Sequence, residues 1–411
     1  MKKILVLNSD TEGVFKFRFA DPHLCMKNTL DKISNKPFDV DMRLLSDSTI
    51  PLLDENFLKQ YKIIVYNKVL PFNNPQYKVM FNMICKKYDI KIIYDIDDSY
   101  CLTNTHPNYK TWKDNNMQQI TMDCISGADM ITTTTEIFQK NLLELNKNVT
   151  VLPNAINFKE YQFNNRPLYK GNKISFIWIG GITHLVDLKL MEESFKNLDK
   201  DMIEKMRLIL CGFDLRMRMP NGEMSRDDPK KSHWTHFEMI FSNNYKYIKN
   251  AEYKKYLMSY DDTNFGIKED FMEEFYQRHW TKSIPLYATH YHEAESGKLI
   301  CFAPLKNNNT FNEKKSQLKL IESGAFGHPL IASNYAAYTI DDIEGKTDGK
   351  QKGFLIDEDD KMGWKRAIKY YLDNPEKIKE HGQNNYEHIK KNYDMEVVNE
   401  KRMKMYMDLM K

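Results

Sequence analysis

The chain has 411 residues, of which 41% are hydrophobic and 12% aromatic, enough to build packed cores. A single hydrophobic core rarely serves more than about 250–300 residues, so the length predicts two domains. The net charge is only +3, from 60 basic and 57 acidic residues, which excludes a chain that is strongly basic throughout, as many nucleic-acid-binding proteins are. A local basic patch is still compatible with this balance.

The cysteines and the apolar stretches indicate in which cellular compartment the protein is expected. None of the six cysteines stands in a Cys-x-x-Cys spacing, which argues against a zinc site or a disulfide framework and favours reduced, intracellular thiols. The N-terminal MKKILVLNSD has an apolar run of only four residues, too short for the core of a signal peptide. No stretch approaches the roughly 20 apolar residues of a membrane span. We therefore expect a cytoplasmic protein without a transmembrane segment, in the host cytoplasm if the gene is viral.

The first 165 residues alternate short apolar runs with longer mixed segments. Six of the runs are expected to be strands: 4–7, 39–45, 62–67, 90–96, 128–134 and 149–154. Strands separated by helix-length intervals predict right-handed βαβ units and a parallel sheet. Residues 1–165 are therefore expected to form one Rossmann-like domain.

The same alternation restarts after a polar connection and predicts a second domain over residues 166–385. Its expected strands are 174–181, 206–213, 299–305, 328–333 and 352–357. Two helical patterns follow them, over 361–372 and 376–411. Too much chain lies between the second and third of these strands for one crossover. Residues of about 214–290 are expected to be an insertion, beginning with a polar loop over 214–234. The predicted fold class is α/β, with two doubly wound domains whose strand carboxyl ends face a cleft.

The stretch FAPLKNNNTFNEKKSQLKLIESGAFGHPLIAS (302–333) predicts a ligand site. It has the pattern of a strand end, an Asn-rich loop, a helix of about 315–324, a Gly-x-Pro turn and a second apolar strand. A loop that enters a helix from the carboxyl end of a strand presents backbone N–H groups and a positive dipole end to a phosphate. Glu322, one to two turns along the helix, can accept hydrogen bonds from a ribose diol. An ordinary strand–helix–strand unit with solvated charges explains the pattern nearly as well.

This stretch resembles the donor-binding signature of retaining GT-B glycosyltransferases of the group 1, family 4-like kind. Weaker similarities follow in the order that this fold requires: IIYDIDD, SGADMITTTTE, VLPNAIN and ISFIWIGGITHLVDLKLM. The resemblance implies an N-terminal acceptor domain, a C-terminal donor domain, and a terminal helix (386–411) that crosses back to the first domain. It also implies a nucleotide-diphosphate sugar as co-substrate and no obligatory metal or other cofactor.

The sequence departs from the family at one of two paired glutamates that stand near the donor. Glu322 matches the second glutamate, whereas the first position, eight residues earlier, is Lys314. The resemblance therefore implies that Glu322 binds the ribose and that Asn312, with Lys315 and Ser316, replaces the missing contact. If Lys314 faces the donor, a different sugar or a more anionic donor is implied.

The diphosphate is expected to lie near a glycine pair. Gly180 and Gly181 follow a strand and precede a helix that starts near Leu185, so their amides can approach an anion closely. Lys189 in that helix and Lys315 in the signature add positive charge. A plain turn explains the glycine pair about as well.

A histidine follows the glycine pair in GITHLVD. Thr183 and His184 stand where the subgroup resembled often has a Thr-His pair, so they are expected to contact the sugar or the phosphate, with His184 among the catalytic residues. Asp187 is interpreted structurally, as an acid in the first turn of a helix that Thr183 caps.

Three carboxylates end the fourth strand of the first domain: Asp95, Asp97 and Asp98. Related enzymes commonly place a catalytic or orienting side chain there, and one of these could orient the acceptor hydroxyl or accept its proton. Adjacent residues on a strand point to opposite faces, so not all three can serve the cleft. Solvated acids in a loop, or an Asp-x-Asp metal site, are the competing interpretations, and the resemblance argues against the metal.

The sequence says least about the residues that would bind the acceptor. Gly13 would let the backbone approach a substrate, and Arg18, in the same loop, is expected to bind a phosphate or a sugar. The insertion adds basic residues and a tryptophan, diluted by acids, which would suit a nucleic acid or an anionic lipid: Arg216, Arg218, Arg226, Lys230, Lys231, His233 and Trp234.

Together with these patterns, the resemblance implies a glycosyltransferase that transfers a hexose or a pentose to a surface glycan or a related saccharide and retains the anomeric configuration of the sugar. Two alternatives remain open. A virus-encoded enzyme that glycosylates hydroxymethylated DNA bases would use the same donor, and the missing glutamate also suits a non-catalytic protein that binds nucleotide sugars.

Overall fold

The structure is a computed structural model of the 411-residue chain. It describes residues 3–9, 14–26, 39–45, 50–72, 75–104, 106, 108–160, 163, 173–180, 184–211, 216–218, 224–226, 240, 298–307 and 310–411. Three candidate site residues, Gly13, Gly181 and Thr183, lie outside these ranges, as does most of the predicted insertion. None of the helices in the described ranges combines the length and the apolar content that crossing a bilayer requires.

The chain forms two compact units, which we call the first and the second unit. The first comprises Met1–Phe158, Asn309–Ser316 and Lys391–Lys411, and the second comprises Lys159–Asn308 and Gln317–Lys390. Part of the signature stretch, Asn309–Ser316, thus groups with the N-terminal residues, and so do the last residues of the chain.

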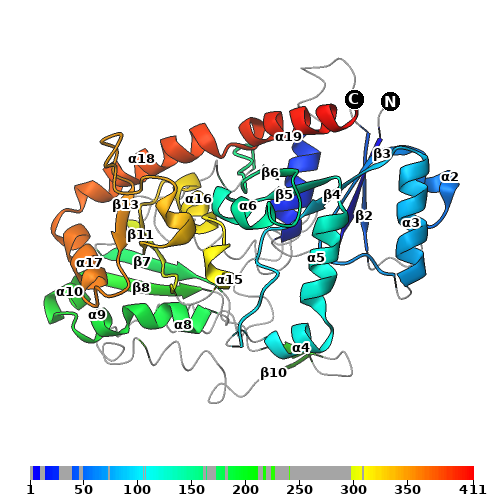
Figure 1. The fold of residues 1–411 in the computed structure, drawn as a ribbon. Helices are drawn as coiled ribbons and strands as arrows, with labels where there is room; N and C mark the ends of the chain where they lie inside the picture. Colours follow the sequence, from blue (N-terminus) through cyan, green and yellow to red (C-terminus); the bar gives the residue numbers. More distant parts are fainter. Residues whose placement is uncertain are drawn as a thin grey trace. The chain divides into compact units, whose positions relative to one another are not determined.

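The first unit is built on a parallel sheet, as predicted. Its strand order is β2-β1-β3-β4-β5-β6, and every neighbouring pair is parallel. Figure 1 shows these strands in blue to green; their bounds are β1 (Lys3–Asn8), β2 (Asp39–Leu44), β3 (Tyr61–Tyr66), β4 (Lys91–Asp95), β5 (Met130–Thr133) and β6 (Val149–Val151). The strand order reverses direction between β1 and β3, which defines a doubly wound sheet.

Helices fill the intervals between these strands. The described helices of the first unit include the π-helical turn η1 (Phe15–Ala20), α2 (Glu55–Leu58), α3 (Pro75–Lys87), α4 (Tyr109–Asp114), α5 (Met117–Gly127), α6 (Glu136–Leu142), α15 (Thr310–Glu313) and α19 (Met395–Leu409). The start of α6 follows from its sequence, because the Thr135 hydroxyl accepts the Phe138 N–H and caps the helix. Asp394 caps α19 in the same way through Glu396, which explains why the run expected over 376–411 is two helices.

The terminal helix α19 packs within the first unit. His23 Nε2 lies 2.9 Å from the Tyr406 hydroxyl, and the Met395 N–H donates to the Ile156 carbonyl over 2.8 Å. The side chains of Val398 and Met403 are buried with those of strands β1 and β3. Burial, and then the nearby Arg402, lower the pKa of His23 to about 3, so this imidazole is neutral in the folded protein.

The second unit repeats the doubly wound plan. Its sheet has the order β13-β12-β11-β7-β8, all parallel: β7 (Ile174–Ile179), β8 (Met206–Cys211), β11 (Leu299–Ala303), β12 (Leu330–Ser333) and β13 (Gly353–Ile356). The order reverses between β7 and β11. Within the loop expected over 214–234, the described residues instead form a short antiparallel pair, β9 (Arg216–Arg218) with β10 (Met224–Arg226).

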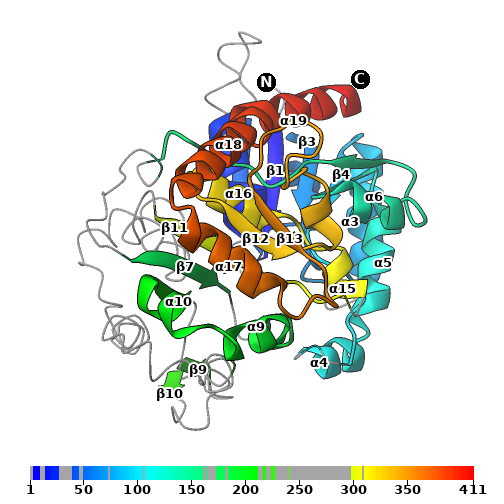
Figure 2. The ribbon, with the colours of Figure 1, turned by 90° about the vertical axis from the view of Figure 1, so that its left-hand side faces the viewer.

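The helices of the second unit include two corrections to the expected pattern. In the described ranges they are α8 (Leu185–Leu188), η3 (Lys189–Met191), α9 (Glu192–Lys196), α10 (Lys200–Lys205), α16 (Leu318–Ala325), η4 (Ala336–Thr339), α17 (Gly363–Asp373) and α18 (Glu376–Asn392). The helix expected over 315–324 is wrong in its start, because α15 ends at Glu313 and α16 begins at Leu318. The helix after the glycine pair is broken into short pieces. Figure 2 shows α17 against the strands of this sheet.

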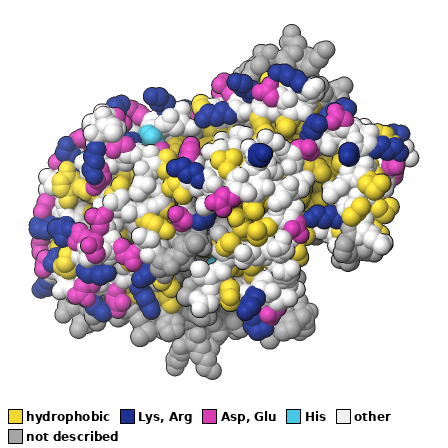
Figure 3. Space-filling model, viewed as in Figure 1, with side chains coloured by type: hydrophobic (Ala, Val, Ile, Leu, Met, Phe, Trp, Pro, Cys, Tyr) yellow, Lys and Arg dark blue, Asp and Glu magenta, His cyan; other side chains and the backbone are white. Residues whose placement is uncertain are grey.

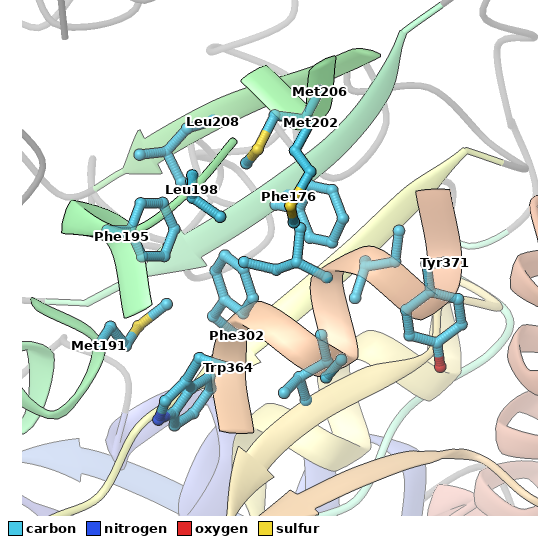
Figure 4. Close-up of a cluster of buried hydrophobic side chains, with 14 of the residues drawn as sticks. Phe176, Met191, Phe195, Leu198, Met202, Met206, Leu208, Phe302, Trp364 and Tyr371 are labelled. Atoms are coloured by element: carbon cyan, nitrogen blue, oxygen red, sulfur yellow. The ribbon is translucent and has the colours of Figure 1, made fainter. Parts of the chain in front are cut away.

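Aromatic side chains form the core between this sheet and α17. Phe302 on β11 stacks on Phe176 at 5.5 Å between ring centroids and meets Phe195 and Trp364 edge-on at 6.1 and 5.9 Å (Figure 4). Edge-on and stacked pairs contribute about 0.5–1.5 kcal/mol each beyond their burial. This packing fixes β7 and β11 side by side, and the loops that follow both strands carry candidate site residues.

Candidate active site

The loops after β7 and β11 meet where the strand order of the second unit reverses. In doubly wound sheets, ligands bind at this edge, beyond the carboxyl ends of the strands. Asp187, on α8, connects the two loops: its Oδ2 lies 2.8 Å from His184 Nδ1, and its Oδ1 accepts the Lys306 N–H over 2.9 Å. The Asp187 side chain is only 6% exposed. The structural interpretation of Asp187 was therefore incomplete, because this carboxylate orients the predicted catalytic histidine.

Gly180 is required by its neighbours in the fold. A Cβ atom at this position would lie 2.5 Å from Trp178 Cζ2 and 3.2 Å from His184 Cδ2. The rings of Trp178 and His184 meet edge-on, with centroids 6.2 Å apart. The glycine therefore lets the histidine ring approach the end of β7. Lys189 is exposed where α8 passes into η3.

Glu322 lies on α16, half-buried and paired with Lys319 at 2.9 Å. It also lies near Tyr338 of η4: burial raises the pKa of the Tyr338 hydroxyl, and the charges of Asp187 and Glu322 raise it further. Tyr338 is thus a protonated hydroxyl close to both carboxylates. Sequence reasoning missed it, although it follows the strand PLIAS by only a few residues.

In the first unit, two predicted site residues are each other's partners. Arg18 donates from Nε to Asp95 Oδ1 over 3.0 Å and from Nη2 to Asp95 Oδ2 over 2.6 Å, and it also donates to the Leu152 carbonyl. Thr132 Oγ1 donates to Asp95 as well, over 2.6 Å. Both charged side chains are buried, and Arg18 lies in η1 rather than in the predicted loop. The pair holds η1 to the end of β4, a role that the sequence did not reveal.

The other two carboxylates after β4 differ in exposure. Asp97 is half-buried, and burial together with the negative charges of Asp98 and Asp95 raises its pKa to about 7, although Arg18 opposes the shift. Asp98 is exposed, and its Oδ1 lies 3.9 Å from Lys315 Nζ. A carboxyl group that titrates near neutral pH can exchange a proton with a substrate hydroxyl. Asp97 is therefore the best-placed acid or base of the three.

The signature segment Asn309–Ser316 brings further groups to this edge of the first sheet. Lys315 Nζ lies 4.7 Å from the centre of the Phe311 ring, which in turn contacts the His106 ring at 4.9 Å. Burial, and then the charge of Lys315, lower the pKa of His106. His106 stands in a polar loop without any motif, so no sequence signal pointed to it.

Ser316 is held by the end of the VLPNAIN motif. Asn154 Nδ2 donates to Ser316 Oγ over 3.1 Å, while Asn154 Oδ1 is buried and has no hydrogen-bond partner in the described part of the chain. The same holds for the hydroxyls of Thr133, the last residue of β5, and Thr134, which follows it. Buried polar atoms without partners are rare in folded proteins and often face a ligand or water.

The position that replaces the family's first glutamate is buried. Lys314 is 7% exposed, and its Nζ lies 2.6 Å from the carboxylate of Glu313. Asn312 is similarly buried, at 6% exposure. The charge of Lys314 is therefore balanced by its neighbour. Across the described ranges, no three His, Cys, Asp or Glu side chains are grouped so that they could hold a metal ion.

Comparison by sequence finds no match, either to a protein-family model or to a curated protein. Solved structures do match. Sucrose-phosphate synthase from Thermosynechococcus elongatus is 14% identical, covers 99% of both chains and has a TM-score of 0.56. Anabaena HepE, solved with UDP-glucose, is 9% identical over 99% of this chain and 100% of its own, with a TM-score of 0.54.

A third match is the UDP-forming α,α-trehalose-phosphate synthase from Burkholderia vietnamiensis, 8% identical over 100% of this chain and 97% of its own, with a TM-score of 0.52. All three similarities extend over almost the entire length of both chains, and at such low identity they inform on the fold alone. With its two doubly wound units, this chain has the GT-B fold.

Proposed function

We propose that this protein transfers a sugar from a nucleotide-diphosphate donor to a hydroxyl acceptor. The observation that carries the proposal is the group at the reversal point of the second sheet. There Asp187 contacts both His184 and the loop that follows β11, and the carboxylates of Asp187 and Glu322 both lie near the Tyr338 hydroxyl. The structures that resemble the chain include one solved with UDP-glucose and one named as UDP-forming. UDP-hexoses are therefore the first donors to test.

The donor side follows from what the reaction requires. The diphosphate gains charge as the glycosidic bond breaks, so cations and backbone N–H groups near it accelerate the reaction. We assign this role to the amides of Gly180 and Gly181, with Lys189 and Lys315, and ribose binding to Glu322. Thr183, His184, Asn312 and Ser316 are assigned to the sugar and the phosphates.

The acceptor side is assigned to the first unit. Asp97 orients the acceptor hydroxyl or receives its proton. The proposed acceptor is a saccharide, and the transferred sugar keeps its anomeric configuration. The two alternatives give different results. Transfer to DNA would depend on the basic side chains of the insertion, which the structure does not describe. Binding of DNA would weaken steeply as the salt concentration rises. A protein that only binds nucleotide sugars would not hydrolyse the donor when acceptor is absent.

Replacing Glu322 with alanine is expected to raise the dissociation constant of the donor by roughly 10- to 100-fold. The variant loses a charge-assisted hydrogen bond to the ribose, worth about 1.5–3 kcal/mol. Isothermal titration with a panel of nucleotide sugars measures this change. Glu387→Ala is the matched control, because Glu387 also pairs with a lysine, at 3.0 Å, on α18 of the same unit. An unchanged affinity in folded Glu322→Ala would refute the donor site.

Replacing Asp187 with asparagine is expected to lower kcat by roughly 10- to 100-fold, because a neutral amide makes a weaker hydrogen bond to the His184 ring than a carboxylate does and orients it less firmly. Steady-state kinetics measures the loss. Asp341→Asn is the control: Asp341 lies 2.8 Å from His388 on α18 and is equally buried. If both variants lose activity to the same extent, the effect of Asp187 is structural.

A further inference from the structure

Four of the large hydrophobic side chains that the structure leaves exposed lie on one helix, α3. Tyr77, Val79, Met80 and Met83 are 44%, 57%, 47% and 66% exposed. Figure 3 shows hydrophobic side chains gathered over this helix. Single exposed apolar residues need no explanation, but a group of neighbours marks an interaction site.

The exposed face of α3 is not needed for folding, because the opposite face already supplies the core. Phe81, Ile84 and Cys85 are buried among the side chains of the first sheet. Val79 and Met83 are four residues apart, so they lie one above the other on the surface, with Met80 beside them. The helix is therefore apolar on two sides, and only one of them has a partner in the described part of the chain.

The charge of α3 indicates the kind of surface that covers it. The helix, PQYKVMFNMICKK, carries three lysines and no acid. Lys86 and Lys87 end it and are exposed, and Lys87 also pairs with Glu55 of α2 at 2.6 Å. A second copy of the same face would bring lysines together, whereas an anionic surface would attract them.

We propose that α3 docks the first unit onto the surface of an anionic lipid bilayer. Val79, Met80 and Met83 enter the boundary between headgroups and acyl chains, and Lys86 and Lys87 contact the headgroups. Tyr77 suits the same boundary, because its ring is apolar and its hydroxyl is polar. This surface goes beyond the proposed function and uses none of the residues assigned to the donor.

Co-sedimentation of the full chain with vesicles tests the proposal. We expect binding to vesicles of phosphatidylcholine with phosphatidylglycerol at low ionic strength, and none to phosphatidylcholine alone. The triple variant Val79→Ser, Met80→Ser, Met83→Ser should bind at least about tenfold more weakly. The double variant Lys86→Gln, Lys87→Gln should bind more weakly and depend less on salt.

A triple variant elsewhere on the first unit is the control: Leu44→Ser, Leu143→Ser and Met407→Ser, at positions 36%, 45% and 40% exposed. Its binding should equal that of the wild type. Equal losses in both triple variants, or no binding of the wild type to anionic vesicles, overturn the proposal. The proposal is also overturned if light scattering shows that the wild type is a dimer and that the triple variant of α3 is a monomer, because a second copy of the chain then covers this face. Donor binding by the same variants is measured in a separate titration. Absence of donor binding there contradicts the proposed function and leaves the lipid-binding result unaffected.

Discussion

Replacing Arg18 with alanine is expected to destabilise the first unit by about 3–5 kcal/mol, a large part of the stability of a typical domain. The substitution leaves the carboxylate of Asp95, which is 4% exposed, buried without its cation. It also removes the hydrogen bond to the Leu152 carbonyl and opens a cavity between η1 and β4. Urea unfolding followed by circular dichroism measures the loss.

An exposed pair of the same type provides the control. Arg43 donates to Asp41 from Nε and Nη2 over 2.8 and 3.3 Å, but its side chain is 49% exposed. Water screens this pair, so Arg43→Ala should cost less than about 1 kcal/mol. Replacing both buried charges, Arg18→Met with Asp95→Leu, should restore much of the loss. A loss below about 1 kcal/mol for Arg18→Ala would contradict the structural role of the pair.

Replacing Asp97 with asparagine is expected to lower turnover by roughly 10²- to 10⁴-fold, the range that a general acid or base contributes. The wild-type rate should rise with pH through about 7, where Asp97 ionises, and the variant should lose this dependence. Asp98→Asn is the informative control. It removes a charge that raises the pKa of Asp97, so its profile should move to lower pH and keep its shape. Unchanged turnover in Asp97→Asn would remove Asp97 from the reaction.

The same substitution should stabilise the protein at high pH. The pKa of Asp97 is about 7 in the folded chain, above its ordinary value of 3.8, so the folded state binds the proton more tightly than the unfolded state. Its contribution to stability is present at low pH and is lost as the pH rises from about 4 to 7. Asparagine cannot ionise. The difference in unfolding free energy between Asp97→Asn and the wild type should therefore grow over this range, as urea titrations at several pH values would show.

The strands could be predicted because a parallel sheet buried on both faces needs continuous apolar runs. Residues 4–7 and 62–67, for example, correspond closely to β1 and β3. The helix of the signature could not be placed as well, because its charged residues fit either a helix or a loop and the contacts of Phe311 and Ser316 decide between them.

The functional groups were predictable in type but not in environment. Nothing in the sequence shows that Arg18 pairs with Asp95, 77 positions away, so an accessible arginine was expected where a buried ion pair lies. Likewise, Asp95, Asp97 and Asp98 are the same residue type, and only burial and neighbouring charges distinguish Asp97. Asp187 does lie in the first turn of a helix, as predicted, but its second contact could not be predicted, because its partner Lys306 comes from a distant loop.

The central claim, transfer of a sugar from a nucleotide donor, is tested most directly by measuring nucleoside diphosphate released from a panel of nucleotide sugars. The wild type is expected to release it from at least one donor, slowly with water alone and faster with a saccharide acceptor. Glu322→Ala should need a higher donor concentration, and Asp97→Asn should be slower at saturating donor. A folded wild-type protein that neither binds nor cleaves any donor of the panel, with or without acceptor, would contradict the proposal.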